Sequence, residues 1–196
     1  RRSEIAHKIE GMHEVPLDVC GADTQGAIGY ELQQALQNEL FHRGISKNVA
    51  TVVTQVLVDG DDPAFSNPTK PIGGFVDAAE AARFRDQMGW SVMEDAGRGW
   101  RRVVASPRSR EIVELDSVKA LLAAGTVVIT VGGGGIPVVD VGGGEYRGVA
   151  AVIDKDDAAS LLARAVGAGL FLIATAVEKV AINFGKPDQK WIDRMT

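Results

Sequence analysis

Apolar residues recur every four positions along the first part of the chain: Ile28, Leu32, Leu36 and Leu40. This spacing predicts a helix over 23–41, and Gly44 is a suitable stop after it. The β-branched run at 49–58 then predicts a strand. The cluster of aspartates, glycine and proline at 59–63 predicts a turn after that strand.

The last part of the chain has the most regular pattern. Residues 117–124 are predicted to be helical, and 126–131 form a continuous apolar run, as strands buried on both faces do. A second helix is predicted at 155–166 and a second buried strand at 170–175. Strand, loop, helix and strand in this order predict a βαβ unit, and therefore an α/β fold with a parallel sheet covered by helices.

Residues 63–110 differ from both regular parts, because they are rich in proline, glycine and charge. One helix is predicted at 78–88, with short strands near 90–93 and 100–104. We expect this segment to project from the main domain as a lobe, which leaves 1–62 and 111–196 as the core.

Bulk composition limits the function classes. The net charge of -5 gives no cationic footprint for a nucleic acid. The longest apolar stretch, 166–177, is far shorter than the roughly 20 residues that a membrane-spanning helix needs. Cys20 is the only cysteine, so it forms no internal disulfide and fits a buried apolar position. With no apolar signal segment at its start, the chain is expected to be cytoplasmic.

Four consecutive glycines at 132–135 follow the apolar strand at 126–131. Ligands bind at the carboxyl ends of strands in open α/β sheets, and glycine N–H groups can surround an anion. Pro137 breaks the dinucleotide fingerprint, and the lysine of a Walker loop is absent. Gly132, Gly133 and Gly134 are therefore candidates for a phosphate cradle, against the alternative of a flexible turn.

Two lysines are candidates for phosphoryl chemistry. Lys155 lies between Asp154 and Asp156 at the start of a predicted helix, where the carboxylates could hold it, cap the helix or approach a Mg²⁺ ion. An ordinary helix cap explains the spacing equally well. Lys70 lies between two prolines that restrict its loop, although a lone lysine is usually only solvated.

Other polar residues give weaker signals. The three histidines have no nucleophile or metal-ligand spacing, so a hydrolase triad, a zinc site or another side-chain metal site is not expected. Trp90 and Trp100 are expected to pack the lobe. Arg98, Arg101 and Arg102 form a basic patch that is expected to be solvated, with anion binding as the alternative.

Several motifs, in family order, resemble the carbamate kinase family. They are Pro16–Ala22, Thr24–Gly26, Asp62–Phe65, Asn67–Gly73, Trp100–Val104, Gly132–Val138, Val152–Asp156, Thr175–Val180 and Gly185–Pro187. The strings PTKPIG and GGGGIPV are specific in combination and argue against other amino acid kinases, such as acylglutamate, aspartate or uridylate kinases.

The resemblance implies the amino acid kinase fold: a three-layer α/β/α sandwich with a mainly parallel sheet and a protruding subdomain at 63–110. It implies that Lys70 reaches from this lobe toward carbamoyl phosphate and that Gly132 and Gly133 contact the transferring phosphoryl group. Lys155 would stabilise the charge on that group, and the two flanking carboxylates, Asp154 and Asp156, would orient lysines or metal-bound water.

The same resemblance assigns the nucleotide, ATP or ADP, to the segment after 170–175. Its residues are Thr175, Ala176, Val177, Glu178, Lys179 and Val180. A polar loop with solvated charges is the alternative that spacing alone favours. The resemblance also implies a Mg²⁺ requirement, a homodimer and a role in arginine catabolism.

The family opens with a Gly-Gly-Asn loop and a second glycine-rich loop, and it ends with a segment that bears a further lysine. The 196 residues contain none of these segments. We therefore expect residues 1–196 alone to be inactive and poorly soluble. The alternative function is a non-catalytic nucleotide-binding or dimerisation fragment.

Overall fold

A computed structural model describes residues 15–194. The predicted positions His7 and His13 and the first fourteen residues of the core lie outside the described part. The helices are α2 (Leu17–His42), α3 (Pro63–Ser66), α4 (Ala78–Met88), α5 (Leu115–Ala123), α6 (Lys155–Ala165) and the 3₁₀ turn η1 (Gly132–Gly134). The strands are β1 (Val49–Thr51), β2 (Gln55–Val58), β3 (Lys70–Val76), β4 (Val92–Glu94), β5 (Trp100–Val104), β6 (Ser109–Ile112), β7 (Val127–Ile129), β8 (Ile136–Gly142), β9 (Glu145–Gly148), β10 (Val180–Ile182) and β11 (Lys190–Ile192).

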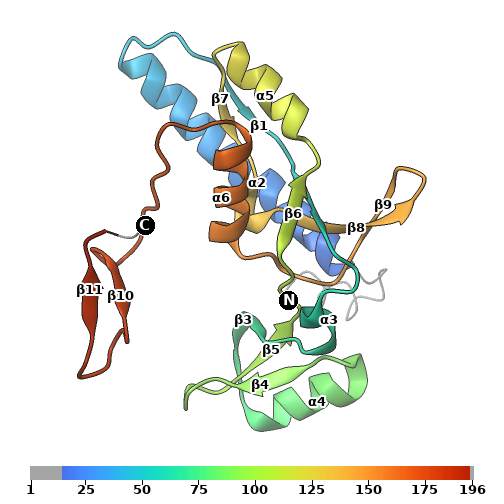
Figure 1. Ribbon diagram of the computed structural model, residues 1–196. Coiled ribbons are helices and arrows are strands. Elements are labelled where there is room, and N and C mark those ends of the chain that lie inside the picture. Colours follow the sequence, from blue (N-terminus) through green and yellow to red (C-terminus); the bar gives the residue numbers. More distant parts are fainter. Residues whose placement is uncertain (1–14, 195–196) are drawn as a thin grey trace.

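Parallel strands carry the central part of the fold. β1 pairs with β7 and β2 pairs with β8, both in parallel. Antiparallel β6 flanks β2 on its other side, and β9 extends the sheet beyond β8. In Figure 1, α6 lies in front of these strands and α2 behind them. The fold is therefore α/β with helices on both faces of the strands, as the sequence predicts.

The main hydrophobic core lies beneath α6. Val56, Ile112, Val131 and Ile153 are buried there with Ala158 of the helix. Residues from two strands, two loops and one helix thus remove their apolar surface from water together, at roughly 25 cal/mol per Å² of area. This packing fixes the start of α6 beside the glycine turn.

On the opposite face, α2 approaches β1 closely. A Cβ atom at Gly29 would lie 2.3 Å from Cγ2 of Thr51, so only glycine permits this approach. The Thr51 hydroxyl donates a hydrogen bond to the Gly29 carbonyl, 2.9 Å away. The helix starts at Leu17, six residues before its predicted start, directly after Pro16.

Thr54 interrupts the predicted strand at 49–58 and is completely buried. Its N–H donates to Oε1 of Gln25 at 2.8 Å, and its carbonyl accepts from Nε2 of the same glutamine at 3.2 Å. Its hydroxyl accepts from the Val131 N–H at 3.0 Å and lies 2.6 Å from the Thr130 hydroxyl. These four residues form the Thr54 network, which joins α2 to the two central strands.

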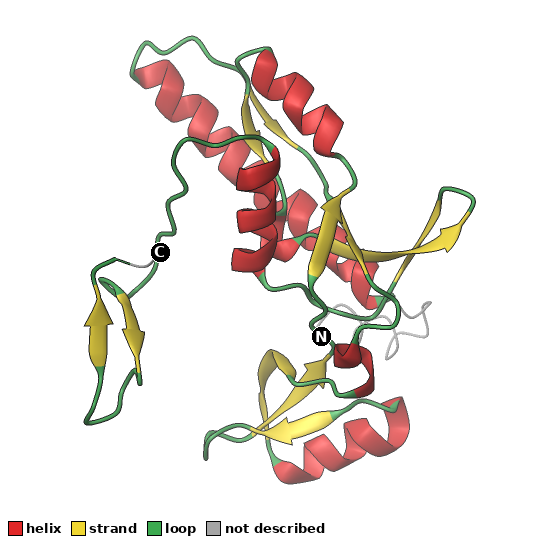
Figure 2. Ribbon diagram, viewed as in Figure 1, coloured by secondary structure: helices red, strands yellow, loops and turns green. Residues whose placement is uncertain are grey.

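The lobe elements have a core of their own. β5 lies between β3 and β4, both antiparallel to it, and α4 covers this small sheet (Figure 2). Phe84 and Trp90 are buried at its centre, and Trp100 packs against them, as predicted. The strand β5 and the helix α4 have their predicted bounds. The limits of the lobe at 63 and 110 stay a prediction.

The predicted buried strand at 170–175 is wrong. This segment is irregular and exposed, with Leu170 82% and Leu172 80% accessible. An apolar run becomes a buried strand only beside other strands, and no described strand pairs with it. Together with the β10–β11 hairpin it forms the C-terminal arm, residues 167–194, and the hairpin stands apart from the rest in Figure 1.

The Thr54 network gives a stability prediction. Thr54→Val preserves the shape of the side chain but leaves the buried Val131 N–H without its acceptor. We expect a loss of about 1–3 kcal/mol in the free energy of unfolding, measured by urea denaturation. Thr54→Ser retains the hydroxyl and should lose less. Equal losses for the two variants would show that the hydroxyl contributes nothing.

Candidate active site

A cavity of about 350 Å³ lies where α2, the strand ends and the lobe meet. The glycine turn contributes Gly132 and Gly133, and β3 of the lobe contributes Ile72 and Gly73. Val152 lines it from the segment that leads into α6. The structure therefore brings three separate predicted motifs to one hollow.

The glycine turn has two unused backbone donors on residues that line this cavity. The N–H groups of Gly134 and Gly135 donate to the carbonyls of Val131 and Gly132, both at 3.1 Å. The N–H groups of Gly132 and Gly133 have no hydrogen-bond partner in the described part of the chain. Adjacent free N–H groups at a turn form a concave site suited to an anion.

The turn has a strained, fixed backbone and is not a flexible loop. Val131, a β-branched residue, has φ 54°, which is a sparsely populated conformation. Gly134 has φ 109°, and a Cβ there would lie 2.4 Å from the Ile153 carbonyl oxygen. The turn therefore packs directly against the backbone that precedes Asp154.

Asp154 performs two tasks at the start of α6. Its Oδ1 accepts the Asp156 N–H at 3.0 Å, which caps the helix. Its Oδ2 lies 2.9 Å from Nζ of Lys70, which reaches across from β3. This ion pair connects the lobe to the core beside the cavity. The sequence alone did not predict that Lys70 and Asp154 pair with each other.

Lys155 is exposed on the first turn of α6. The sequence suggests that its neighbouring carboxylates hold it, but among the described residues neither one pairs with it. Asp154 is taken by Lys70, and Asp156 is exposed. Lys155 is therefore free to approach an anion near the helix N-terminus, where the helix dipole also favours negative charge.

The predicted nucleotide segment is not part of this site. Residues 175–180 are exposed in the C-terminal arm and do not line the cavity. Val180 begins β10, and Lys179 forms an ion pair with Asp193 of the same arm. The structure thus brings the glycines, Lys70 and Asp154 together but leaves the segment 175–180 outside.

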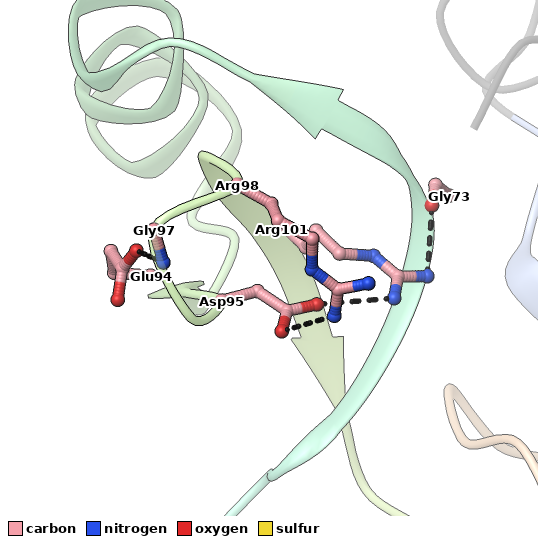
Figure 3. Close-up of polar contacts among 6 residues, drawn as sticks. All are labelled: Gly73, Glu94, Asp95, Gly97, Arg98 and Arg101. Atoms are coloured by element: carbon pink, nitrogen blue, oxygen red, sulfur yellow. Dashed lines mark hydrogen bonds and ion pairs between the residues drawn. The ribbon is translucent and has the colours of Figure 1, made fainter.

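The arginines of the predicted basic patch have protein partners; Arg98 is exposed, as expected, whereas Arg101 and Arg102 are half-buried. Arg98 and Arg101 both pair with Asp95, at 2.9 and 3.4 Å (Figure 3). The guanidinium of Arg102 stacks on the Trp90 ring, 4.1 Å from its centre. The hydrogen bond from Arg98 is the main cause that lowers the pKa of Asp95, with a further contribution from Arg101 and opposition from burial.

Gln25 and Thr54 are the site residues that sequence reasoning missed. Both are buried, and Gln25 also lines the cavity and contacts the position of Gly132. A glutamine on a helix and a threonine in a β-branched run look ordinary in sequence. The Thr24-Gln25-Gly26 motif was the one available signal.

Residues 15–194 contain neither a side-chain metal cluster nor a helix that could cross a membrane. No three histidine, cysteine or acidic side chains lie close enough to hold a metal ion. None of the described helices has both the length and the apolar character needed to cross a membrane.

The fold and site define an α/β protein with a glycine turn, carrying two free N–H groups, between a core and a lobe. The profile of the amino acid kinase family matches residues 19–196. The chain belongs to the amino acid kinase family.

Relatives support this assignment. The chain is 58% identical over 194 residues to the carbamate kinase-like protein YqeA of Escherichia coli (strain K12), covering 98% of this chain and 62% of that protein. It is 51% identical over 193 residues to the carbamate kinase of Thermococcus kodakarensis, covering 98% of this chain and 61% of that protein. The chain thus spans about 60% of the length of these relatives.

A solved structure is similar as well. The carbamate kinase from Giardia lamblia bound to AMP-PNP superimposes with a TM-score of 0.82 at 44% identity, covering 97% of this chain and 60% of that one. The amino acid kinase fold that the sequence predicts is thereby confirmed.

The Lys70–Asp154 pair gives a pH prediction. The hydrogen bond from Lys70 is the main cause that lowers the pKa of Asp154, and the Asp156 N–H adds to it against the effect of burial. A lowered folded-state pKa means that the stabilisation is present above the unfolded value, about 3.9, and is lost as pH falls through the folded value.

Lys70→Met should therefore raise the pKa of Asp154 toward its ordinary value, as measured by ¹³C NMR of its carboxyl group. Asp62 is the matched control, because backbone N–H groups of Ala64 and Arg108 are the main causes that lower its pKa. A shift at Asp62 of the same size, or none at Asp154, would contradict the pairing.

Proposed function

We propose that the protein acts as a carbamate kinase, which transfers a phosphoryl group reversibly between ATP and carbamate to give ADP and carbamoyl phosphate. The observation that carries the proposal is the pair of free N–H groups at Gly132 and Gly133 facing a cavity. Lys155 lies at the neighbouring start of α6, and Lys70, on the lobe strand β3, pairs with Asp154 at that start.

Phosphoryl transfer requires mainly positioning and neutralisation of charge on the equatorial oxygens. In the proposed mechanism, Gly132 and Gly133 donate to oxygens of the transferring group. Lys155 approaches the same group from the N-terminus of α6 and stabilises its charge in the transition state. No general base is required, because carbamate is already an anionic nucleophile.

Lys70 would bind the carbamoyl phosphate side of the reaction. Its ammonium group carries three donors, and Asp154 accepts from one of them. The ion pair keeps the lysine side chain extended from the lobe toward the core. Asp154 would thus act by orienting Lys70, while exposed Asp156 remains a proposed partner of metal-bound water.

The described residues do not form a dedicated Mg²⁺ site. They contain no group of three suitable ligands, and both oxygens of Asp154 are occupied by Lys70 and the helix cap. A requirement for Mg²⁺ is therefore proposed from the family resemblance alone. The described side chains give no basis for assigning Mg²⁺ a step in the reaction.

The remaining assignments rest on the similarity to carbamate kinases. These are the contacts of residues 175–180 with ATP or ADP, a homodimer, a cytoplasmic location and a role in arginine catabolism. The nucleotide assignment further requires the C-terminal arm to lie against the strand ends.

One observation favours a second candidate, a non-catalytic dimerisation or nucleotide-binding module. The arm exposes Leu170, Leu172, Phe184 and Trp191 to solvent. An exposed apolar surface of this kind is typical of an interaction site or an aggregation hazard.

The direct experiment is to express the full product of the gene and to assay ATP formation from ADP and carbamoyl phosphate. The carbamate kinase proposal predicts turnover with carbamoyl phosphate and none with acetyl phosphate, acylglutamyl phosphate or aspartyl phosphate. Nucleotide binding without turnover would support the second candidate instead.

Lys155→Ala is expected to reduce kcat by about 10²–10³, as the loss of one electrostatic stabiliser commonly does. ADP affinity should change little, because the lysine acts on charge that develops during transfer. Lys119→Ala, which removes an exposed lysine from α5, is the control. A decrease of less than about tenfold would reduce Lys155 to a structural role.

Lys70→Ala should raise the KM for carbamoyl phosphate and leave the affinity for ADP nearly unchanged. The reason is that Lys70 begins β3 of the lobe, the strand whose residues Ile72 and Gly73 line the cavity. Steady-state kinetics with each substrate varied in turn measure this. Equal damage to both affinities would indicate that the lobe contact only supports the fold.

A further inference from the structure

We propose that Arg101 is a positioning residue: it fixes the β3 backbone at Gly73 and so sets the lobe wall of the cavity. The inference rests on the proposed function, because the substrate whose binding it controls is carbamoyl phosphate. It deepens that function by assigning a residue that touches neither substrate nor the glycine turn.

The first step is an irregularity in the lobe sheet. Ile72 of β3 lies opposite Arg102 of β5, whereas Val76 lies opposite Trp100. Three residues of β3, 73–75, therefore face Arg101 alone. A bulge of this kind leaves backbone groups outside the ladder and is often found next to active sites, where it redirects a strand.

The second step is that the Arg101 side chain holds this bulge. Its Nη2 donates to the Gly73 carbonyl at 2.9 Å, and its guanidinium lies 5.3 Å from the centre of the Phe75 ring. Nη1 lies 3.4 Å from Oδ2 of Asp95 at the β4–β5 turn. Figure 3 shows Arg101 extending from this turn region to Gly73 on the neighbouring strand.

The third step connects the bulge to the site. Ile72 and Gly73 line the cavity, and Lys70 begins the same strand before its contact with Asp154. Gly73 has φ 71°, a conformation that the bulge requires and glycine readily accepts. A shift of the Gly73 carbonyl would therefore move the cavity wall and the strand that carries Lys70.

Arg101 is suited to hold this wall and not to bind the substrate itself. Its charge is balanced by Asp95, whose pKa is lowered by Arg98 and Arg101 and which is therefore ionised at neutral pH. The Arg101 side chain is only 24% exposed, and its buried Nε has no partner among the described residues. Nη1 donates to Asp95 and Nη2 donates to Gly73.

The test compares Arg101→Met with Arg98→Met in the full product of the gene. Arg98 is a matched control, because it also pairs with Asp95 and lies 5.1 Å from the centre of the Phe75 ring. No hydrogen bond between Arg98 and Gly73 is present. Each substitution removes one positive charge that pairs with Asp95, but only Arg101→Met removes the contact with the bulge.

Arg101→Met should raise the KM for carbamoyl phosphate by about tenfold or more, the size expected for one charge-assisted hydrogen bond. Both kcat and the KM for ADP should stay within about threefold, since the phosphoryl-binding turn is untouched. Arg98→Met should leave the KM for carbamoyl phosphate, the KM for ADP and kcat near their wild-type values. Arg101→Lys, which keeps the charge but not the fork, should recover only part of the affinity.

A second measurement separates this inference from the proposed function. In ¹⁵N NMR spectra, the amide signal of Gly73 should shift in Arg101→Met and remain unchanged in Arg98→Met. If the wild type shows no turnover, the proposed function fails, and this spectrum alone decides whether Arg101 fixes the bulge. An unchanged Gly73 signal, a fall in kcat alone, or equal effects of both variants would overturn the inference.

Discussion

The site depends on a hydrogen bond made by the hydroxyl of Thr54. This hydroxyl accepts a hydrogen bond from the N–H of Val131. Val131 has a left-handed backbone conformation, which costs roughly 1–3 kcal/mol for a β-branched residue. The strained residue turns the chain from β7 into the glycine turn. Gln25 holds Thr54 by both backbone groups, so α2 supports the same geometry. A buried polar network with its groups satisfied can hold strain that apolar packing alone would release.

The turn and the lobe meet at the start of α6. Gly134 packs against the carbonyl before Asp154, and Asp154 pairs with Lys70 from β3. A partly exposed ion pair contributes little stability, so its value here is geometric: it sets how far the lobe lies from the core. In this arrangement, free N–H groups, a lysine from the lobe and a lysine at a helix N-terminus share one neighbourhood. That combination is the basis for proposing phosphoryl transfer and not simple anion binding at this turn.

Sequence predicted the elements with strong local signals. The helices α4 and α6, the strand β5 and the glycine turn follow from period, capping and glycine content. The Thr54 network escaped prediction because its partners are 29 and 76 residues apart, and polar residues in a β-branched run give no local sign of burial. The prediction of a buried strand at 170–175 is wrong for the opposite reason. Its apolar composition indicates burial, but a strand is buried only beside neighbouring strands. The arginines of the lobe looked solvated because the role of Asp95 emerges only when the hairpin folds.

In the proposed function, the N–H groups of Gly132 and Gly133 bind the phosphoryl group. This binding is tested most directly by ¹⁵N NMR titration of the protein with carbamoyl phosphate and, separately, with inorganic phosphate. We expect saturable downfield shifts of the Gly132 and Gly133 amides, while Gly142, Gly143 and Gly144, at the exposed β8–β9 turn, stay unchanged. Shifts confined to that turn, or no shift at Gly132 and Gly133 at saturating ligand, would contradict it.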